Sequence, residues 1–456
     1  ALRKNQTSLS TSLERLSTGL RINSGADDPA GLIASENLKS EQSGITAAID
    51  NANMATNIIG TAEGGLSEVS RLLTQLQGLI TQTANDGGLS SDQKAANQQQ
   101  VDSILSTINR ISQTTTFQGQ QLLNGKYGYT TSGVASTAIT DLQINAAAIP
   151  QGGSTTVNVN VIASGTHAKI GYTGGTVAAG GVSIQLGGTI GTQTLTFASG
   201  TTVSSIAASI NAVASQTGVS AVVSGTALNI ESQELGSSQF VSVKAVTGAF
   251  ANTAGSSGRA AGKDAIVSIN GSAAEVNGID VSYRNAGLDV KFDLKSTFNK
   301  TGTTTFNVTG GGATFQLSSK VTGAGIASIG IGDVSTSSLG NALTGYLSSL
   351  ASGGTNSLTA GHLETSQKIV DLAVNQISDL RGRLGAFETY TLGSQINSLS
   401  VAYENASSAE SAITDTDFAA ETANLTREQV LVSSATSVLS HANATPQNAL
   451  TLLQNA

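Results

Sequence analysis

The residues with which this chain could do chemistry are few. His167, His362 and His441 lie far apart, and no HExxH pattern places two of them on one helix face to bind a metal. The chain has no cysteine, so thiolate catalysis and cysteine-based zinc sites are excluded. The glycine run at 310–312 precedes a strand-like stretch instead of a helix, and no GxxxxGK[ST] motif occurs. We therefore predict no enzyme and no cofactor, while a calcium site built from Asp and Asn loops stays open, although no EF-hand spacing occurs.

Charge and composition narrow the classes of partner. The formal net charge is −8, only 11% of residues are charged and 4% are aromatic. A phosphate-binding surface needs clustered Lys and Arg, so we expect no nucleic acid partner. No run of 18 apolar residues occurs, and we expect no membrane span. The chain opens directly on an amphipathic helical pattern, which predicts export, if any, without a cleaved signal peptide.

Two helical ends enclose a centre of different composition. Residues 1–125 and 360–456 carry apolar side chains every three or four positions, whereas the centre is rich in Gly, Ser, Thr and Val. Asp28-Pro29 is a helix start, with a capping carboxylate before a proline. Long helices bury little by themselves, so we expect the two ends to pack together. The apolar stripes are Leu2, Leu9, Leu13, Leu16 and Leu20; Leu38, Ile45, Ile49, Ala52 and Ile59; Leu66, Val69, Leu73, Leu76 and Ile80; Val101, Ile104, Ile108 and Ile111; and Ile369, Ala373, Ile377, Leu380, Leu384 and Phe387, continued by Leu392, Ile396, Leu399 and Tyr403.

The extreme ends are too poor in charge for an ordinary solvated helix. Along residues 430–439 the apolar groups are not confined to one side. Such a helix is best buried against copies of itself, and repeated head-to-tail contacts build an open filament. We predict that the N-terminal stripe meets the C-terminal helix in these contacts. The predicted self-association residues are Leu9, Leu13, Leu16 and Leu20 with Val438, Leu439, Leu450 and Leu453.

These same ends resemble the bacterial flagellins. ERLSTGLRINSGADDPAG at residues 14–31 is similar to the N-terminal signature of that family, and TSVLSHANATPQNALTLL at residues 436–453 is similar to its C-terminus. Shorter similarities occur at residues 63–66, 116–119 and 413–419. The family's opening residues, roughly a dozen or more in the family's pattern, have no counterpart before Ala1, which puts export and polymerisation in doubt if the polypeptide begins there.

The resemblance implies a fold and a division of the chain. The fold class is α+β multidomain, with long terminal helices forming a coiled-coil-like rod and an inner core, and mainly β central outer domains. The implied domains are an inner-core helix (1–27), a helical rod (28–125), an outer region (126–359), a second rod segment (360–414) and a C-terminal inner-core helix (415–456). Within the outer region, residues 180–246 resemble the IN module of some flagellins, and residues 302–345 resemble the family's return segment.

The resemblance also implies function and partners. The chain is expected to be a structural subunit that self-assembles into the extracellular flagellar filament for motility. Expected partners are further copies of the chain, a flagellar cap protein, hook-filament junction proteins and an export chaperone at the C-terminal helix. The alternatives are a hook-filament junction protein or a surface-displayed adhesin or polysaccharide-binding paralogue. Scarce aromatic residues disfavour sugar binding by stacking.

One departure from the family concerns immune recognition. Flagellins detected by the vertebrate Toll-like flagellin receptor carry an LQRVRELAVQ-like stretch where this chain reads LTQLQGLITQ, at residues 73–82. The positions matching the receptor-contacting Arg and Glu are Gln75 and Gly78. Their loss removes the charge-assisted hydrogen bonds of such an interface, so we expect weak activation of that receptor. The other interpretation is an ordinary outer helix in which Gly78 costs about 1 kcal/mol of helix stability.

Overall fold

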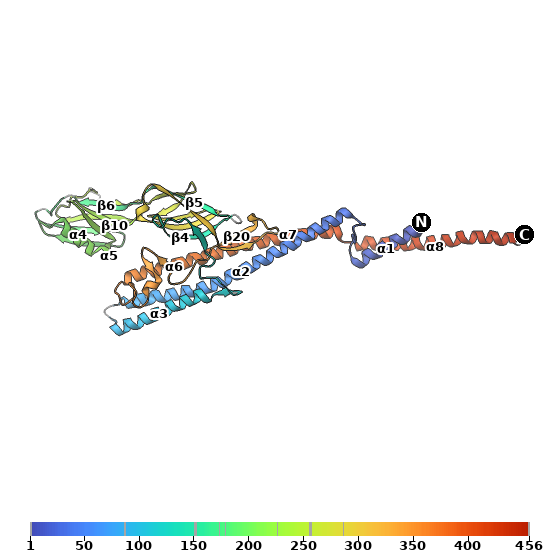
Figure 1. The fold of residues 1–456 in the computed structure, drawn as a ribbon, viewed down its shortest axis with the longest axis horizontal. Helices are drawn as coiled ribbons and strands as arrows, with labels where there is room; N and C mark the ends of the chain where they lie inside the picture. The colour runs from blue at the N-terminus through green and yellow to red at the C-terminus, as the bar shows by residue number, and fades with distance from the viewer. Residues whose placement is uncertain are drawn as a thin grey trace. The chain divides into compact units, whose positions relative to one another are not determined.

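The structure is a computed structural model. It describes residues 2–85, 88–149, 153–172, 174–177, 179–225, 227–254, 258–285 and 287–454, with side chains described up to Pro446 in the last helix. The chain divides into two compact units. Unit 1 comprises Ala1–Asn57, Phe315–Ala327 and Glu388–Ala456, and unit 2 comprises Ile58–Thr314 and Ser328–Phe387. Figure 1 shows helices at both ends of the chain and strands in its middle, as the sequence predicts.

The helices at the two ends of the chain correspond to the predicted apolar stripes. The first stripe begins in the first helix, and the next two stripes form one continuous helix of 55 residues that starts at Pro29. A π-helix at Phe387–Gly393 separates the two C-terminal rod helices. The helices are α1 (Leu2–Thr18), α2 (Pro29–Thr83), α3 (Ser91–Thr114), α4 (Val203–Ala212), α5 (Ala214–Thr217), α6 (Leu363–Ala386), α7 (Ser394–Thr414) and α8 (Phe418–Gln454).

Unit 1 holds α1, the first half of α2, α7 and α8, and a small core lies between α2 and α7. The core cluster consists of Ile45 and Ala48 on α2 with Leu399 on α7. Hydrogen bonds from two side-chain amides join the segment 315–327 to α2 and α7. Asn51 donates to the Gln316 carbonyl at 3.2 Å, and Gln395 donates to the Leu317 carbonyl at 3.0 Å.

In unit 2 the second half of α2 lies with α3 and α6 (Figure 1). The predicted stripes are buried, and Leu105 joins the α3 stripe in place of Ile104 and Ile111, which are half-buried. A capping box of Ser90 and Gln93 starts α3. Polar contacts link α2 to α6, from Gln77 to Asp371 at 2.5 Å and from Glu63 to Arg381 at 3.8 Å.

The centre of the chain, also in unit 2, forms two β-rich cores. The first lies between the sheets β6-β10-β9 and β12-β11-β7-β8 and is covered by α4; it contains Ile170, Ile184, Leu186, Ile206, Ile210, Leu228, Ile230, Val241 and Val243. The second lies between the sheets β14-β13-β5-β18-β3 and β15-β16-β17-β4; it contains Val157, Val159, Val161, Val267, Val290, Phe292, Phe306 and Val308. β5 and β7 alternate buried and exposed residues, as strands with one buried face do, and the centre is mainly β, as the sequence analysis predicts.

The longer strands are β3 (Tyr129–Ser132), β4 (Ile139–Ala147), β5 (Thr155–Ala163), β6 (His167–Tyr172), β7 (Val182–Gly187), β8 (Thr192–Phe197), β9 (Val219–Ser224), β10 (Ala227–Leu235), β11 (Phe240–Thr247), β12 (Arg259–Ala261), β13 (Ile266–Ile269), β16 (Asp280–Arg284), β17 (Leu288–Leu294) and β18 (Gly302–Gly311). Short strands are β1 (Thr116–Phe117), β2 (Gln120–Gln121), β14 (Ser272–Ala273), β15 (Glu275–Asn277), β19 (Ala313–Gln316), β20 (Ile326–Ile329), β21 (Gly340–Asn341) and β22 (Gly345–Tyr346).

Candidate functional site

The two ends of the chain are joined by backbone hydrogen bonds in unit 1. Gly19, with a φ of 75°, ends α1 in the left-handed conformation that glycine adopts without strain. Its carbonyl accepts from the Thr416 amide at 2.9 Å, and the Arg21 amide donates to the Thr414 carbonyl at 2.6 Å. The end of α1 therefore lies beside the start of α8. Because α1 and α8 also pack along their lengths, they run in opposite directions.

The side of α1 that packs on α8 is only partly the predicted stripe. Leu9 and Leu16 are half-buried, and the most buried residue of the helix is Ser12, which is 6% exposed. Leu13 is 51% exposed and Leu20 is 36% exposed. Thus two of the four predicted leucines are half-buried, whereas Leu13 is largely exposed and Leu20 follows the end of α1, where it forms a bridge with Asp415.

On α8 the contact with α1 is near the start of the helix. Glu421 is buried, and Leu425 and Val432 are half-buried. The helix has 37 residues against the 17 of α1, so most of it has no α1 beside it. The predicted residues Val438 and Leu439 are 68% and 48% exposed. The predicted residues Leu450 and Leu453 lie in α8, and their side chains lie outside the described part of the structure.

The turn between α1 and α2 is organised by two aspartates. Asp27 accepts hydrogen bonds from the amide of Ser24 at 2.8 Å and from that of Asn23 at 3.2 Å. The Ser24 backbone and hydroxyl donors hold the pKa of Asp27 below its usual value, because they stabilise the ionised carboxylate. Asp28 accepts from the Gly31 amide at 2.9 Å and so caps α2, as the sequence predicts.

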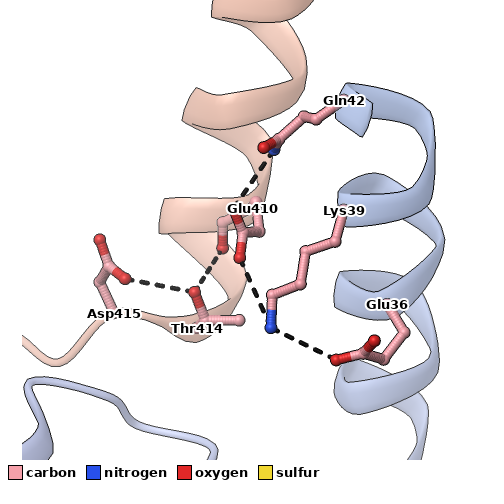
Figure 2. Close-up of polar contacts among 6 residues, drawn as sticks. All are labelled: Glu36, Lys39, Gln42, Glu410, Thr414 and Asp415. Carbon is pink, nitrogen blue, oxygen red and sulfur yellow. Dashed lines mark hydrogen bonds and ion pairs between the residues drawn. The ribbon is translucent and has the colours of Figure 1, made fainter. Parts of the chain in front are cut away.

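A polar cluster that sequence reasoning missed ties α2 to α7 (Figure 2). Lys39 lies 3.3 Å from the Glu36 carboxylate and 3.9 Å from the Glu410 carboxylate. Gln42 donates to the other oxygen of Glu410 at 3.2 Å. The spacing of Glu36 and Lys39 on one helix was visible in the sequence, but their partner is more than 360 positions away. The contacts fix how α2 and α7 pair within unit 1.

The two altered positions that match the receptor-contacting Arg and Glu of other flagellins lie on α2 within unit 2. Gln75 and Gly78 are exposed and line a shallow groove between α2 and α3, together with Gln99 and Ile104. A Cβ atom built on Gly78 would meet nothing within 4 Å. The groove contains no charged side chain. Nothing in the packing of this surface therefore requires a glycine at position 78.

A polar cavity lies between the sheet β15-β16-β17-β4 and α6 in unit 2. Asp280 and Asp293 are direct cross-strand partners there, with Asp141 and Lys291 nearby. Burial raises the pKa of Asp293 to about 7, and the charges of Asp280 and Asp141 add to this shift, while Lys291 opposes it. One oxygen of Asp280 is buried without a hydrogen-bond partner. This pair of carboxyl groups is therefore sensitive to pH.

Neither a metal centre nor a membrane segment is found in the described residues. Over those ranges, no group of three or more His, Cys, Asp or Glu side chains is arranged to hold a metal ion. Within the same ranges, no helix is both long and apolar enough to cross a bilayer. Exposed apolar side chains lie on both terminal helices, among them Leu13 on α1 and Val430 and Val438 on α8.

Three family models match the chain. The bacterial flagellin N-terminal helical region matches residues 1–128, the bacterial flagellin C-terminal helical region matches residues 367–453, and the flagellin hook IN motif matches residues 182–234. The IN motif falls inside the predicted module at residues 180–246. It coincides with α4 and the strands packed around it.

Curated relatives extend over nearly the whole chain. The B-type flagellin of Pseudomonas aeruginosa is 32% identical, with 98% of this chain and 95% of that protein covered. Polar flagellin F of Vibrio parahaemolyticus is 27% identical, with 98% and 93% covered. Among solved structures, FliC from Burkholderia pseudomallei shares 16% identity with a TM-score of 0.26, covering 74% of this chain and 99% of that chain.

Proposed function

Since the chain belongs to the bacterial flagellin family, the structural subunits of the extracellular flagellar filament, we propose that its α1–α8 pair makes the contacts between copies in that filament. The chain is thus a structural protein and not an enzyme. The proposal adds which surfaces associate. It takes residues 1–27 and 415–456 as the inner core and residues 126–359 as the outer region.

The proposal depends on the apolar side chains that α1 and α8 leave uncovered. Leu13, Val438 and Leu439 are each about half exposed or more, and Val430 is 58% exposed. Burying a Leu or Val side chain releases about 1.5–3 kcal/mol, so a line of them strongly favours association. The contact between copies requires an apolar partner surface, which a different side of another copy's α1–α8 pair supplies. A head-to-tail contact of this type builds an open filament when the rotation between copies does not close.

Seeded polymerisation tests this proposal. Purified full chain is added to short filament fragments, and assembly is followed by sedimentation and negative-stain electron microscopy. We expect long filaments from the intact chain, none from a version lacking residues 415–456, and strongly reduced assembly from a Val438→Ser, Leu439→Ser variant. Val222→Ser is the matched control, because Val222 is a 53% exposed valine on β9 in unit 2. Normal assembly of the α8 variant would contradict the proposed contact.

The same surface supports proposals about export and assembly partners. An exposed apolar helix in the cytoplasm favours aggregation, so we expect an export chaperone to cover α8 before secretion. Export would proceed without a cleaved signal peptide, and a cap protein would guide addition at the filament tip. The double variant at Val438 and Leu439 would then also lose chaperone binding, which calorimetry on the purified pair measures.

We further propose weak recognition by the Toll-like flagellin receptor. Gln75 and Gly78 are exposed, yet the groove beside them holds no charged group to pair with a receptor. The Gln75→Arg, Gly78→Glu variant should therefore raise the potency in a receptor reporter assay, since charge-assisted bonds at an interface contribute strongly. Gly78→Ala with Gln75→Ala is the control for helix stabilisation alone. Equal potency of the charged variant and the original chain would contradict this proposal.

A further inference from the structure

The two β cores of unit 2 are joined by two chain segments that cross from one core to the other. Residues 163–167 lead from β5 in the second core to β6 in the first, and residues 261–266 lead back from β12 to β13. These crossing segments pair with each other, since the Thr166 amide donates to the Lys263 carbonyl at 2.8 Å and the Lys263 amide donates to the Thr166 carbonyl at 3.1 Å. The first core is therefore attached through a paired joint and not through two separate linkers.

One carboxylate in the joint accepts hydrogen bonds from both β cores. Asp264 Oδ1 accepts from the Ser237 amide, in the turn between β10 and β11 of the first core, at 2.8 Å. The same oxygen accepts from the Gly278 amide, in the turn between β15 and β16 of the second core, also at 2.8 Å. Asp264 Oδ2 accepts from the Ser237 hydroxyl. Because hydrogen bonds to an ionised group are about twice as strong as neutral ones, the ionised form of Asp264 holds the two turns together.

The two turns also contact each other directly, with no space for a side chain between them. A Cβ atom on Gly236 would lie 2.9 Å from the Gly278 Cα atom, and a Cβ atom on Gly278 would lie 2.6 Å from the Leu235 carbonyl oxygen. A Cβ atom on Gly165 would lie 2.8 Å from the Gly278 carbonyl oxygen. The Asn299 side chain accepts from the Gly165 amide at 2.7 Å and donates to the Gly165 carbonyl at 2.8 Å. Backbone therefore packs on backbone at the joint, which leaves little room for one core to rotate on the other.

The hydrogen bonds of the joint also favour the ionised form of Asp264. Burial disfavours the carboxylate, but the bonds from Ser237 and Gly278 outweigh burial and lower the pKa of Asp264 from its ordinary value of 3.8. Over the residues that the structure describes, no charged neighbour contributes to this shift. The stabilisation is present above pH 3.8 and is lost as the pH falls through the lowered pKa. The other titratable side chains on the segments that meet at the joint are His167, Glu234, Lys263, Glu275, Asp280 and Lys300.

From these observations we propose that Asp264 is an acid-sensitive link between the two β cores, and that its ionised form makes them one rigid body. While the carboxylate is ionised, the turns at Ser237 and Gly278 are bonded to one oxygen, and the first core projects from the second in a fixed direction. Protonation removes the charge, weakens these hydrogen bonds and allows the first core to move about the crossing segments. The inference goes beyond the proposed function, because it concerns a single copy of the chain and requires no contact between copies.

Distance measurements between the two β cores test this link in the full chain. The chain contains no cysteine, so Thr194→Cys on β8 and Thr305→Cys on β18 place one spin label on each core at exposed positions. Pulsed electron–electron double resonance then measures the distribution of distances between the labels, which we expect to be narrow at neutral pH. Asp264→Ala leaves both amides without their acceptor and should widen the distribution at least about 2-fold. Glu234→Gln, at an exposed carboxylate near the same turn, is the matched control and should leave the width unchanged.

Asp264→Asn separates the effect of charge from that of geometry. The amide keeps an oxygen acceptor but carries no charge and does not titrate. We therefore expect a width between those of the original chain and Asp264→Ala, and the same width at neutral pH and at about pH 3. The original chain should widen towards the Asp264→Asn value over the same range. Circular dichroism at strand wavelengths shows that the sheets persist under each condition.

Three results would overturn the inference. A narrow distribution in Asp264→Ala at neutral pH would show that the crossing segments alone hold the cores together. A broad distribution in the original chain at neutral pH would show that the cores are not one rigid body. Equal widening of the original chain and Asp264→Asn in acid would show that another group senses the pH. Ser237→Ala removes only the hydroxyl donor and, as the milder variant, should widen the distribution by a smaller factor than Asp264→Ala.

Discussion

Apolar side chains are buried in the β cores, whereas many of those on the α1–α8 pair are exposed. In the second β core, Phe292 is fully buried and Phe306 is 1% exposed, each by partners from the same chain. On α1 and α8, Leu13 and Val438 stay largely exposed, and the residue most buried on α1 is a serine. The difference shows that the β cores are complete within one molecule, whereas the terminal helices present an apolar surface suited to a partner. Stability and assembly are therefore expected to depend on different parts of the chain.

The largest effect on the monomer should come from the β core. Phe292→Ala removes a fully buried ring from between two sheets, and we expect the free energy of unfolding to fall by about 3–5 kcal/mol. Urea unfolding followed by circular dichroism at strand wavelengths measures this change. Leu13→Ala is the comparison on α1. If both substitutions destabilise the monomer equally, the contrast between the two regions is wrong.

An intermediate effect is expected at the start of α2. Asp28→Ala removes the acceptor for the Gly31 amide, so we expect a loss of about 1 kcal/mol from the helices of unit 1. Asp28→Asn keeps an acceptor oxygen and should retain most of the stability. Thermal unfolding followed at helix wavelengths distinguishes the two. Equal loss in both variants would show that the cap does not act through this hydrogen bond.

The paired carboxyl groups of the second β core should make its stability depend on pH. The pKa of Asp293 is raised to about 7 from an ordinary value of 3.8, so the folded state holds a proton that the unfolded state has released. The stabilisation is complete below about pH 4 and is lost as the pH rises through about 7. Asp293→Asn should flatten this decline and stabilise the core at alkaline pH, by about 1 kcal/mol for two like charges directly opposite.

Asp264 is expected to change the stability with pH in the direction opposite to Asp293. Its carboxylate accepts from Ser237 and Gly278, and these hydrogen bonds lower its pKa, against the opposing effect of burial. Stability from Asp264 is therefore present above its ordinary pKa and is lost as the pH falls. Asp264→Asn should destabilise the protein at neutral pH. Stability curves for the two variants that change in the same direction with pH would contradict these assignments.

The smallest effect on the monomer is expected for the exposed leucine of α1. Leu13→Ser changes a side chain that is 51% exposed, and surface substitutions of this kind shift the free energy of unfolding by less than about 0.5 kcal/mol. Filament yield should nevertheless fall strongly, because the apolar surface is lost in every copy. Paired unfolding and sedimentation measurements on one preparation show both. Normal filament yield would show that Leu13 does not take part in the contact between copies.

The sequence by itself determined the elements and the family. Apolar spacing of three and four residues predicted the rod helices, and Asp28-Pro29 predicted the start of α2. These signals are local, so the residues that carry them lie within a few positions of each other. The terminal motifs were equally readable, since each is contiguous in the chain. The IN module was predicted from the resemblance of residues 180–246, and the family model matches residues 182–234.

Only the tertiary structure decided which of these residues meet. Ser12 is buried while Leu13 is 51% exposed, and α8 has 37 residues against the 17 of α1; a stripe in one helix cannot specify either result. The ion pair of Lys39 with Glu410 and the carboxyl pair of Asp280 with Asp293 depend on distant segments and on strand register. The three hydrogen bonds of Asp264 likewise depend on turns from two β cores. Such contacts join positions far apart in the chain, and their geometry is set by packing and not by local propensity.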